Sequence, residues 1–212
     1  MLKADKRLLR KAISSTLWAL APQDIQAQSQ AVTHRVLALP AFQACQTVSC
    51  YLSMPSGELD TSTLVAEILK AGKTLFVPKV DVLGPGSMDL LKIHDTDDLQ
   101  SLPAGVWGIK EPTSHYNQQP RLTVMDPRCE DLDLILVPGV AFDHSLSRLG
   151  HGKGYYDRFI SSYSEAWRKR PLLVALALRE QIVDENNVPV GDHDWKMDLV
   201  ISPDGIIKPS GA

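Results

Sequence analysis

The amino-acid sequence predicts a single α/β domain in three layers, with a parallel or mixed central sheet and helices on both faces. Three observations support this prediction. The chain has 212 residues, which suits one α/β domain. Short apolar runs typical of buried strands alternate with amphipathic segments typical of helices. A glycine-rich turn follows one of the apolar runs and leads into a helical segment, as in folds that bind ligands at strand ends.

Two helical segments open the chain. Residues 3–20 repeat apolar and basic side chains at the spacing of an amphipathic helix. Pro22 suits the first turn of a second helix, and we expect Pro40 to end it. No repeat or low-complexity linker interrupts the sequence, so residues 1–212, including the N-terminal basic helix, are expected to form one domain.

Strand and helix patterns alternate in the rest of the chain. Gly72 stands where a left-handed helix C-cap is expected, and residues 88–93 suit an edge strand. Residues 94–131 show little periodicity, and a stretch of this length is usually functional or mobile. The predicted strands are residues 47–52, 73–77, 88–93, 132–137, 172–178 and 199–202, and the predicted helices are residues 61–69, with Asp60 or Thr61 as the cap, and about 155–167.

Composition narrows the class of protein. Hydrophobic residues make up 44% and charged residues 22%, which excludes wholesale disorder, and the net charge of −3 does not suit a general nucleic-acid binder. No apolar run is long enough to span a membrane. Cys45, Cys50 and Cys129 form no disulfide or zinc pattern, which suits a reducing compartment. We expect a cytoplasmic monomer or dimer, with a mitochondrial fraction as the alternative because residues 1–21 faintly resemble a presequence.

The densest chemical signal is a glycine-rich run. Pro138 to Asp143 is followed by Arg-Leu-Gly-His-Gly-Lys-Gly-Tyr-Tyr-Asp at positions 148–157. Glycines at alternate positions let backbone N–H groups approach an anion, and the start of the following helix adds partial positive charge. Arg148 and Lys153 add two cations. The run predicts a phosphate-binding loop of an uncommon type; the alternative is a tight glycine turn with basic residues at the surface.

Asp157 follows this run directly. A carboxylate beside bound phosphates can hold Mg²⁺, which takes one or two carboxylates besides phosphate oxygens and water. The alternative is a first-turn carboxylate that is stabilised by the helix dipole.

This run, from Val137 to Asp143 and from Arg148 to Arg158, strongly resembles the 5-formyltetrahydrofolate cyclo-ligase (5,10-methenyltetrahydrofolate synthetase) family. Weaker similarities to that family occur in order along nearly the whole chain. The resemblance implies ATP-dependent cyclisation of 5-formyltetrahydrofolate to 5,10-methenyltetrahydrofolate, with release of ADP and phosphate. It further implies phosphorylation of the formyl oxygen and attack by N10 of the folate. The fold is expected to be similar to that of sugar-phosphate isomerases and CoA transferases.

The resemblance also implies residue roles. Arg148, Lys153 and Asp157 are the expected catalytic residues, and Mg²⁺ is expected at Asp157 and Asp194. The expected ATP-binding residues are Lys6, Arg10, Arg148, Leu149, Gly150, His151, Gly152, Lys153, Gly154, Tyr155 and Tyr156. The expected folate-binding residues are Leu52, Met54, Glu58, Trp107, His151, Gly152, Lys153, Gly154 and Tyr155.

Each of these roles has an alternative. Lys6 and Arg10 also suit a solvated basic helix face, and Glu58 suits an exposed turn residue. The turn that ends at Glu58 is one residue longer than in some relatives. His151 stands where relatives often have Arg or Tyr, which can alter folate affinity or its pH dependence. The remaining alternatives are that Trp107 anchors its loop on the core, and that Asp192 or Asp198 replaces Asp194.

Two other classes of function compete with the cyclo-ligase. One is another enzyme on a similar scaffold, such as a sugar-phosphate isomerase or a CoA transferase. The other is a binding module without catalysis, either a folate reservoir or a nucleic-acid adaptor. Neither the isomerase nor the transferase needs the basic helix, the glycine–tyrosine run and the late aspartate together, and the net charge of −3 argues against the adaptor.

Overall fold

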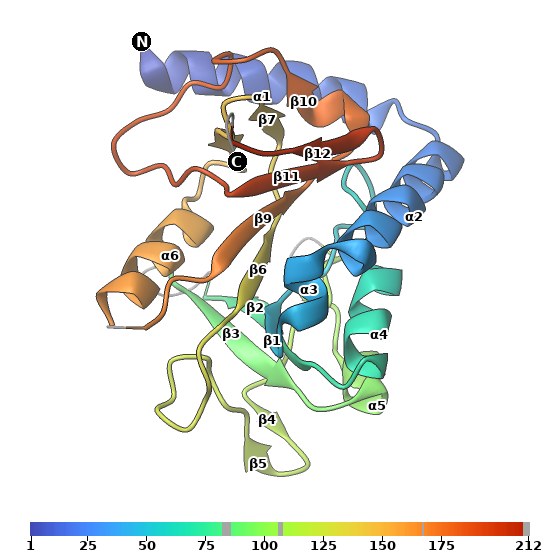
Figure 1. Cartoon of the computed structure of the whole chain (residues 1–212), viewed down its shortest axis with the longest axis vertical. Helices are drawn as coiled ribbons and strands as arrows, with labels where there is room; N and C mark the ends of the chain where they lie inside the picture. Colours follow the sequence, from blue (N-terminus) through green and yellow to red (C-terminus); the bar gives the residue numbers. More distant parts are fainter. Residues whose placement is uncertain (82–85, 106–107, 167, 210–212) are drawn as a thin grey trace.

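The computed structural model describes residues 1–81, 86–105, 108–166 and 168–209. A seven-stranded sheet forms its centre (Figure 1). Its strands are β1 (Thr47–Ser49), β2 (Thr74–Val80), β3 (Met88–Ile93), β6 (Leu134–Val137), β9 (Leu172–Leu176), β11 (Leu199–Ser202) and β12 (Gly205–Ile207). The order is β12-β11-β9-β6-β1-β2-β3, in which the five central strands are parallel and both edge strands are antiparallel. The expected mixed sheet, with residues 88–93 at an edge, is confirmed.

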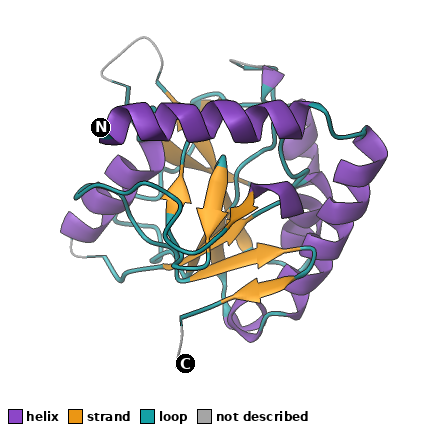
Figure 2. Ribbon diagram, turned by 90° about the horizontal axis from the view of Figure 1, so that it is seen from above, coloured by secondary structure: helices purple, strands orange, loops and turns teal. Residues whose placement is uncertain are grey.

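Helices cover both faces of this sheet. They are α1 (Leu2–Trp18), α2 (Pro22–Ala38), α3 (Pro40–Ala44), α4 (Ser62–Lys70), α5 (Thr96–Ser101) and α6 (Tyr155–Glu165). Figure 1 shows α2, α3 and α4 together on one side and α6 on the other, and Figure 2 shows α1 lying across the top. The predicted three-layer α/β fold is therefore confirmed.

The alternating direction of side chains along the strands explains why helices pack on both faces of the sheet. In β6, Leu134 and Leu136 belong to the core cluster that contains the buried side chains of α2, α3 and α4. Ile135 and Val137, the intervening residues, belong to the cluster that contains the buried side chains of α6. Because successive side chains of a strand point to opposite faces, an uninterrupted apolar run predicts a strand that is covered on both sides.

A second, small sheet was not predicted. It consists of β7 (Ala141–Asp143), β8 (Arg148–Leu149) and β10 (Ile182–Val183), and α1 packs against it through Leu9 and Ile13. The fully buried Asp143 shapes the β7–β8 turn, because its Oδ1 atom accepts hydrogen bonds from the backbone of Ser145 and Ser147. The glycine-rich run therefore does not follow the buried strand β6 directly; it leaves the small sheet at β8.

Several boundaries differ from the sequence prediction. Strand β1 ends at Ser49 and not at residue 52, so Tyr51 and Leu52 leave the sheet at its carboxyl edge. Strand β2 continues to Val80, because its antiparallel pairing with β3 extends the ladder. Pro40 begins the short helix α3 as well as following α2. As predicted, Gly72 has a positive φ of 71°. Thr61 is the N-cap of α4, but its side chain makes no capping hydrogen bond, because its hydroxyl group donates to the carbonyl oxygen of Tyr51; Asp60 Oδ1, one residue earlier, accepts from Ser62 N.

The segment 94–131 is ordered by one buried ion pair. It contains α5 and a short hairpin of β4 (His115–Tyr116) and β5 (Gln119–Pro120). The Arg121 guanidinium binds both carboxylate oxygens of Asp98, and these side chains are 1% and 0% exposed. Arg121 also donates to the carbonyl oxygens of Thr113 and Lys92, which ties the segment to β3.

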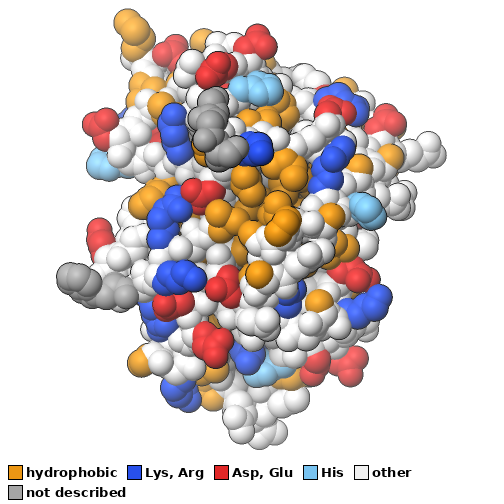
Figure 3. Space-filling view, viewed as in Figure 1, with side chains coloured by type: hydrophobic (Ala, Val, Ile, Leu, Met, Phe, Trp, Pro, Cys, Tyr) orange, Lys and Arg blue, Asp and Glu red, His pale blue; other side chains and the backbone are white. Residues whose placement is uncertain are grey.

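In the view of Figure 3, basic and acidic side chains are interspersed and form no continuous basic stripe. Among the described residues, no helix is long and apolar enough to cross a membrane.

We expect Asp98→Asn to lower the free energy of unfolding by about 3–5 kcal/mol at pH 7, because Arg121 keeps a buried, uncompensated charge. Burial alone would raise the pKa of Asp98, but the hydrogen bonds from Arg121 and from the His94 N–H group, together with the charge of Arg121, outweigh it and lower the pKa. The stabilisation is therefore complete above the unfolded pKa of about 3.9 and is lost as the pH falls through the folded pKa.

Urea unfolding at several pH values measures this effect, with the exposed neighbour Asp97→Asn as the control. Equal stability of the two variants at pH 7 would contradict the role of the pair.

Candidate functional site

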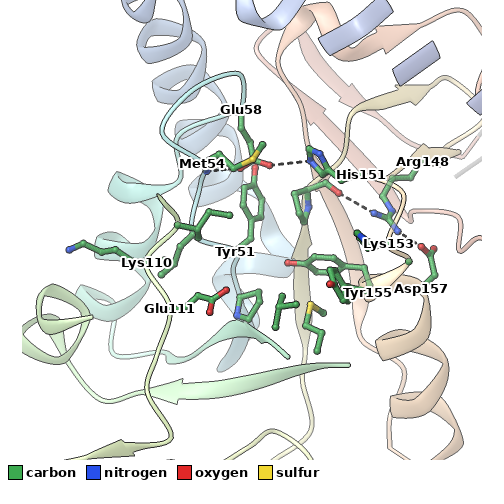
Figure 4. A pocket seen from close by; sticks show the side chains of 18 residues that line it. Tyr51, Met54, Glu58, Lys110, Glu111, Arg148, His151, Lys153, Tyr155 and Asp157 are labelled. Atoms are coloured by element: carbon green, nitrogen blue, oxygen red, sulfur yellow. Dashed lines mark hydrogen bonds and ion pairs between the residues drawn. The ribbon is translucent and has the colours of Figure 1, made fainter. Parts of the chain in front are cut away.

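A cavity of about 370 Å³ opens at the carboxyl ends of β1, β2 and β6 (Figure 4). The segments after β1 and β6, residues 50–58 and 138–157, supply most of its walls. Because the carboxyl ends of parallel strands meet at one edge, segments that are about 90 residues apart lie side by side there. The predicted site residues that line this cavity are Leu52, Met54, Glu58, Arg148, His151, Lys153, Gly154, Tyr155, Tyr156 and Asp157.

The glycine-rich turn joins β8 to the N-terminus of α6. Gly152 and Gly154 have φ values of 98° and 66°, a left-handed conformation that favours glycine. At Gly150 the conformation is ordinary, but a Cβ atom would lie 3.0 Å from Arg148 Nη1. The turn therefore needs glycine at these positions, two for backbone conformation and one for space beside a guanidinium.

Arg148 connects the parts of the turn. Its side chain is 4% exposed, and Nη2 donates a 2.7 Å hydrogen bond to Asp157 Oδ2. Nη1 donates to the carbonyl oxygen of Pro138 at the end of β6. The buried Nε atom has no hydrogen-bond partner among the described residues. A buried donor without a partner costs free energy, which a bound acceptor would recover.

Helix α1 reaches the same turn from outside. Arg10 Nε donates a 2.7 Å hydrogen bond to the carbonyl oxygen of Gly150. Lys6 forms an ion pair with Asp194 Oδ2, and its side chain is only 16% exposed. The two residues therefore do not belong to a solvated basic face, although neither lines the cavity.

Asp157 and Asp194 lie on neighbouring segments. The backbone N–H of Trp195 donates to Asp157 Oδ1, and that of Gly191 donates to Asp194 Oδ2. Burial alone would raise the pKa of Asp194, but the hydrogen bonds from Lys6 and Gly191, together with the charges of Lys6 and Arg148, outweigh it, so the pKa is lowered. Both carboxylates are held in place by a cation and by a backbone N–H group.

The two carboxylates suit a Mg²⁺ ion that is shared with a phosphate chain. The described residues contain no cluster of three or more His, Cys, Asp or Glu side chains, so a cage built from protein alone is not present there. Mg²⁺ usually takes one or two carboxylates with phosphates and water. Of the alternatives, Asp192 is exposed, and Asp198 binds Arg170 and the backbone of Leu173. Asp194 directly precedes Trp195, whose N–H group donates to Asp157, so it lies on a segment that contacts Asp157.

Glu58 lies in the opposite wall from Asp157 (Figure 4). It is 6% exposed, so it is not the exposed turn residue of the alternative interpretation. Its Oε2 atom accepts a 2.8 Å hydrogen bond from Met54 N, and Oε1 lies 3.8 Å from His151 Nε2. Gly57, which directly precedes Glu58 in the turn, has a φ of 71°.

Some predicted residues are not part of the cavity wall. Leu149 is 1% exposed and packs with Ala141 and Val188 in the small core under α1. Trp107 lies outside the described residues. The others are Lys6, Arg10, Gly150, Gly152 and Asp194.

Sequence reasoning missed part of the wall, which consists of Tyr51, Pro78, Val80, Met88, Ile109, Lys110, Glu111 and Pro138. A signal for four of them was available: Pro138 belongs to the run with the strong family similarity, and Pro78, Ile109 and Glu111 belong to segments with the weaker similarity. Val80 and Met88 could not be found in this way, since only the pairing of β2 with β3 brings them to the cavity. Burial raises the pKa of Tyr51 well above its usual value, so its hydroxyl group stays protonated.

A second hollow, of about 670 Å³, adjoins the first. The two share Leu52, Met54, Glu58 and Lys110 as walls, and the second is bounded on its far side by α1 and the start of α2. The first cavity thus continues toward a larger open groove, which leaves room for a ligand longer than one heterocycle.

Comparison with known proteins agrees with this geometry. The family model described as the 5-formyltetrahydrofolate cyclo-ligase family matches residues 2–203. A Schizosaccharomyces pombe protein named a probable 5-formyltetrahydrofolate cyclo-ligase is 36% identical over 209 residues, which cover 96% of this chain and 97% of the relative. The Mus musculus 5-formyltetrahydrofolate cyclo-ligase is 33% identical, with 94% of each chain covered.

The fold comparison gives the same result. The NMR structure of Aquifex aeolicus 5,10-methenyltetrahydrofolate synthetase superposes with a TM-score of 0.76 at 30% identity, and it covers 98% of this chain and 94% of its own. The resemblance that the glycine–tyrosine run indicated is confirmed: the chain belongs to the 5-formyltetrahydrofolate cyclo-ligase family and is an enzyme of that class.

Proposed function

We propose that the chain catalyses ATP-dependent cyclisation of 5-formyltetrahydrofolate to 5,10-methenyltetrahydrofolate, with release of ADP and phosphate. One observation carries the proposal. A single cavity joins a glycine turn with two cations, Arg148 and Lys153, to a wall with a buried carboxylate, Glu58. The first part suits a phosphate chain, and the second suits the N–H groups of a pterin.

The reaction depends more on alignment of the two substrates than on covalent chemistry by protein side chains. A formamide oxygen is a poor leaving group, so the γ-phosphoryl group of ATP is first transferred to it, which breaks the bond to ADP. N10 of the folate then attacks the activated carbon and loses its proton to solvent. Cleavage of the carbon–oxygen bond finally releases phosphate. Such phosphoryl transfer depends on positioning and charge neutralisation.

The cations of the turn have distinct roles in this reaction. Lys153 is exposed, and its ammonium group has no hydrogen-bond or ion-pair partner among the described residues, so it is available to the transferred phosphoryl group. Arg148 is buried and already paired with Asp157, which gives it a fixed orientation. A mobile and a fixed cation together can stabilise the negative charge of the phosphoryl group while it is transferred from ATP to the formyl oxygen.

Mg²⁺ would be held by Asp157 and Asp194 and would neutralise charge on the phosphates when bound. Lys6 and Arg10 support the site by holding Asp194 and the carbonyl oxygen of Gly150. Direct contact of these two side chains with ATP is also part of the proposal, because Arg10 lies against the turn and Lys6 lies against Asp194.

The folate would occupy the wall opposite the turn. Leu52, Met54 and the aromatic rings of Tyr155 and Tyr156 provide apolar surface, and Glu58 accepts hydrogen bonds from the ring. The cavity volume of about 370 Å³ suits one heterocycle, and the adjoining groove leaves space for the rest of the molecule.

We further propose that residues 1–212 act as one domain, as a cytoplasmic monomer without nucleic-acid or membrane partners. The two main core clusters lie on the two faces of a single sheet, which supports one domain. All three cysteines are free, which suits a reducing compartment. A dimer and a mitochondrial fraction are the alternatives.

Purified protein given ATP, Mg²⁺ and 5-formyltetrahydrofolate should form the near-ultraviolet absorbance of the methenyl product, together with stoichiometric ADP. Tight folate binding by folded protein without any ADP release would support a folate reservoir and contradict the enzyme.

Lys153→Ala should lower kcat by about 10²–10³-fold, because one donor to the developing charge is lost. Circular dichroism should stay unchanged, since the side chain packs against nothing in the core. Lys169→Ala, an exposed lysine outside the cavity, serves as the control. A kcat within twofold of the wild type for Lys153→Ala would remove Lys153 from the mechanism.

Asp194→Asn should raise the Mg²⁺ concentration for half-maximal activity by about tenfold, because one charged ligand becomes neutral. The matched control is Asp192→Asn, which changes an exposed carboxylate in the same loop. If Asp192→Asn gives the larger shift, the assignment of the second magnesium carboxylate is wrong.

A further inference from the structure

Glu111 is a carboxylate in the cavity wall for which the reaction described above has no use. It follows Lys110, and Figure 4 shows that the two side chains diverge: Lys110 points outward, whereas Glu111 points into the cavity. Its surroundings in the wall are apolar and include Pro78, Val80 and Ile109.

The conformation of this side chain is imposed by its neighbours. A Cβ atom at Gly105 would lie 2.8 Å from both Cγ and Cδ of Glu111, so the side chain lies directly on the glycine backbone. The Glu111 N–H group donates to the carbonyl oxygen of Pro103 at 3.1 Å. Lys79 Nζ, on β2, donates a 2.8 Å hydrogen bond to the carbonyl oxygen of Pro112. These contacts fix the segment against the sheet and hold the carboxylate in one position.

The carboxylate itself has no hydrogen-bond donor among the residues that the structure describes. The nearby ammonium group of Lys79 donates its hydrogen bond to the Pro112 carbonyl oxygen. Burial raises the pKa of Glu111, and the charge of Lys79 offsets only part of this effect. A partly desolvated carboxylate without a partner costs free energy, and N–H donors of a bound ligand would recover that cost.

We propose that Glu111 is a specificity-determining residue for the folate substrate, in which its carboxylate accepts hydrogen bonds from N–H groups of the reduced heterocycle. This inference rests on the proposed function and adds to it a second acceptor, in a different part of the wall from Glu58. A tetrahydropterin carries N–H donors on two edges, the amino-pyrimidine edge and the reduced ring. Acceptors on two parts of the wall match this distribution.

The role is recognition and not chemistry. Glu111 comes from the segment after α5, whereas the phosphate-binding cations come from the turn before α6. Loss of the carboxylate should therefore weaken binding of folate and leave the affinity for ATP unchanged.

The test is an equilibrium titration of the protein with 5-formyltetrahydrofolate in the absence of ATP. Glu111→Gln, which keeps the size of the side chain, should raise Kd by about ten- to hundred-fold, the usual loss for a charge-assisted hydrogen bond. The KM for ATP should stay within twofold of the wild type. Glu130→Gln removes an equal charge at an exposed position outside the cavity and should change neither constant.

Gly105→Ala provides a second variant that leaves Glu111 in the chain. Its methyl group would displace the carboxylate, so it should weaken folate binding, and adding Glu111→Gln to it should have little further effect. Full additivity of the two changes would contradict positioning of Glu111 by Gly105.

A truncated ligand locates the contact. For a 5-formyltetrahydropterin that lacks the aminobenzoylglutamate tail, the Kd of Glu111→Gln relative to the wild type should rise by the same factor as for the full folate. The proposal would be overturned if Glu111→Gln bound both ligands with the same Kd as the wild type. It would also be overturned if the variant lost affinity for the full folate alone. Those outcomes leave the proposed function intact if the variant still turns over; the proposed function fails separately if the wild-type protein produces no methenyl product.

Discussion

The buried guanidinium of Arg148 is the interaction on which the geometry of the site depends. It joins the end of β6, through the carbonyl oxygen of Pro138, to the first turn of α6, through Asp157. A charge that is 4% exposed is stable only when it is paired and hydrogen-bonded. Gly150 has no side chain, and this leaves the space that the guanidinium occupies. The glycine turn, the strand end and the helix therefore form one unit around a single cation.

An ion pair and a hydrogen bond connect the N-terminal helix to the loops of the site. Lys6 and Arg10 lie one turn apart on α1 and contact two different loops, at Asp194 and at the carbonyl oxygen of Gly150. Apolar contacts of Leu9 and Ile13 with the small sheet hold the same helix in place. The helix thus joins the loop that carries Asp194 to the turn that carries the phosphate-binding residues, although it contributes nothing to the cavity wall.

The cavity combines two kinds of surface that suit two kinds of ligand. Cations and backbone N–H groups gather at the start of α6, where the helix dipole adds to their effect. Apolar side chains and the acceptors Glu58 and Glu111 make up the rest of the wall. In the reaction that we propose, a phosphate chain and a nitrogen heterocycle occupy different parts of this one space, and the formyl oxygen meets the phosphoryl group without a covalent intermediate on the protein.

The sequence by itself determined the layers of the fold, the position of the glycine turn and the family, because these depend on local periodicity and on one contiguous motif. The separate sheet of β7, β8 and β10 could not be foreseen, since its strands have two or three residues and β10 pairs with β7 across 40 positions. Tertiary structure alone decided that Lys6 meets Asp194 and that Glu111 enters the cavity. Both contacts join segments far apart in the chain, and long-range packing leaves no periodic signal in either partner.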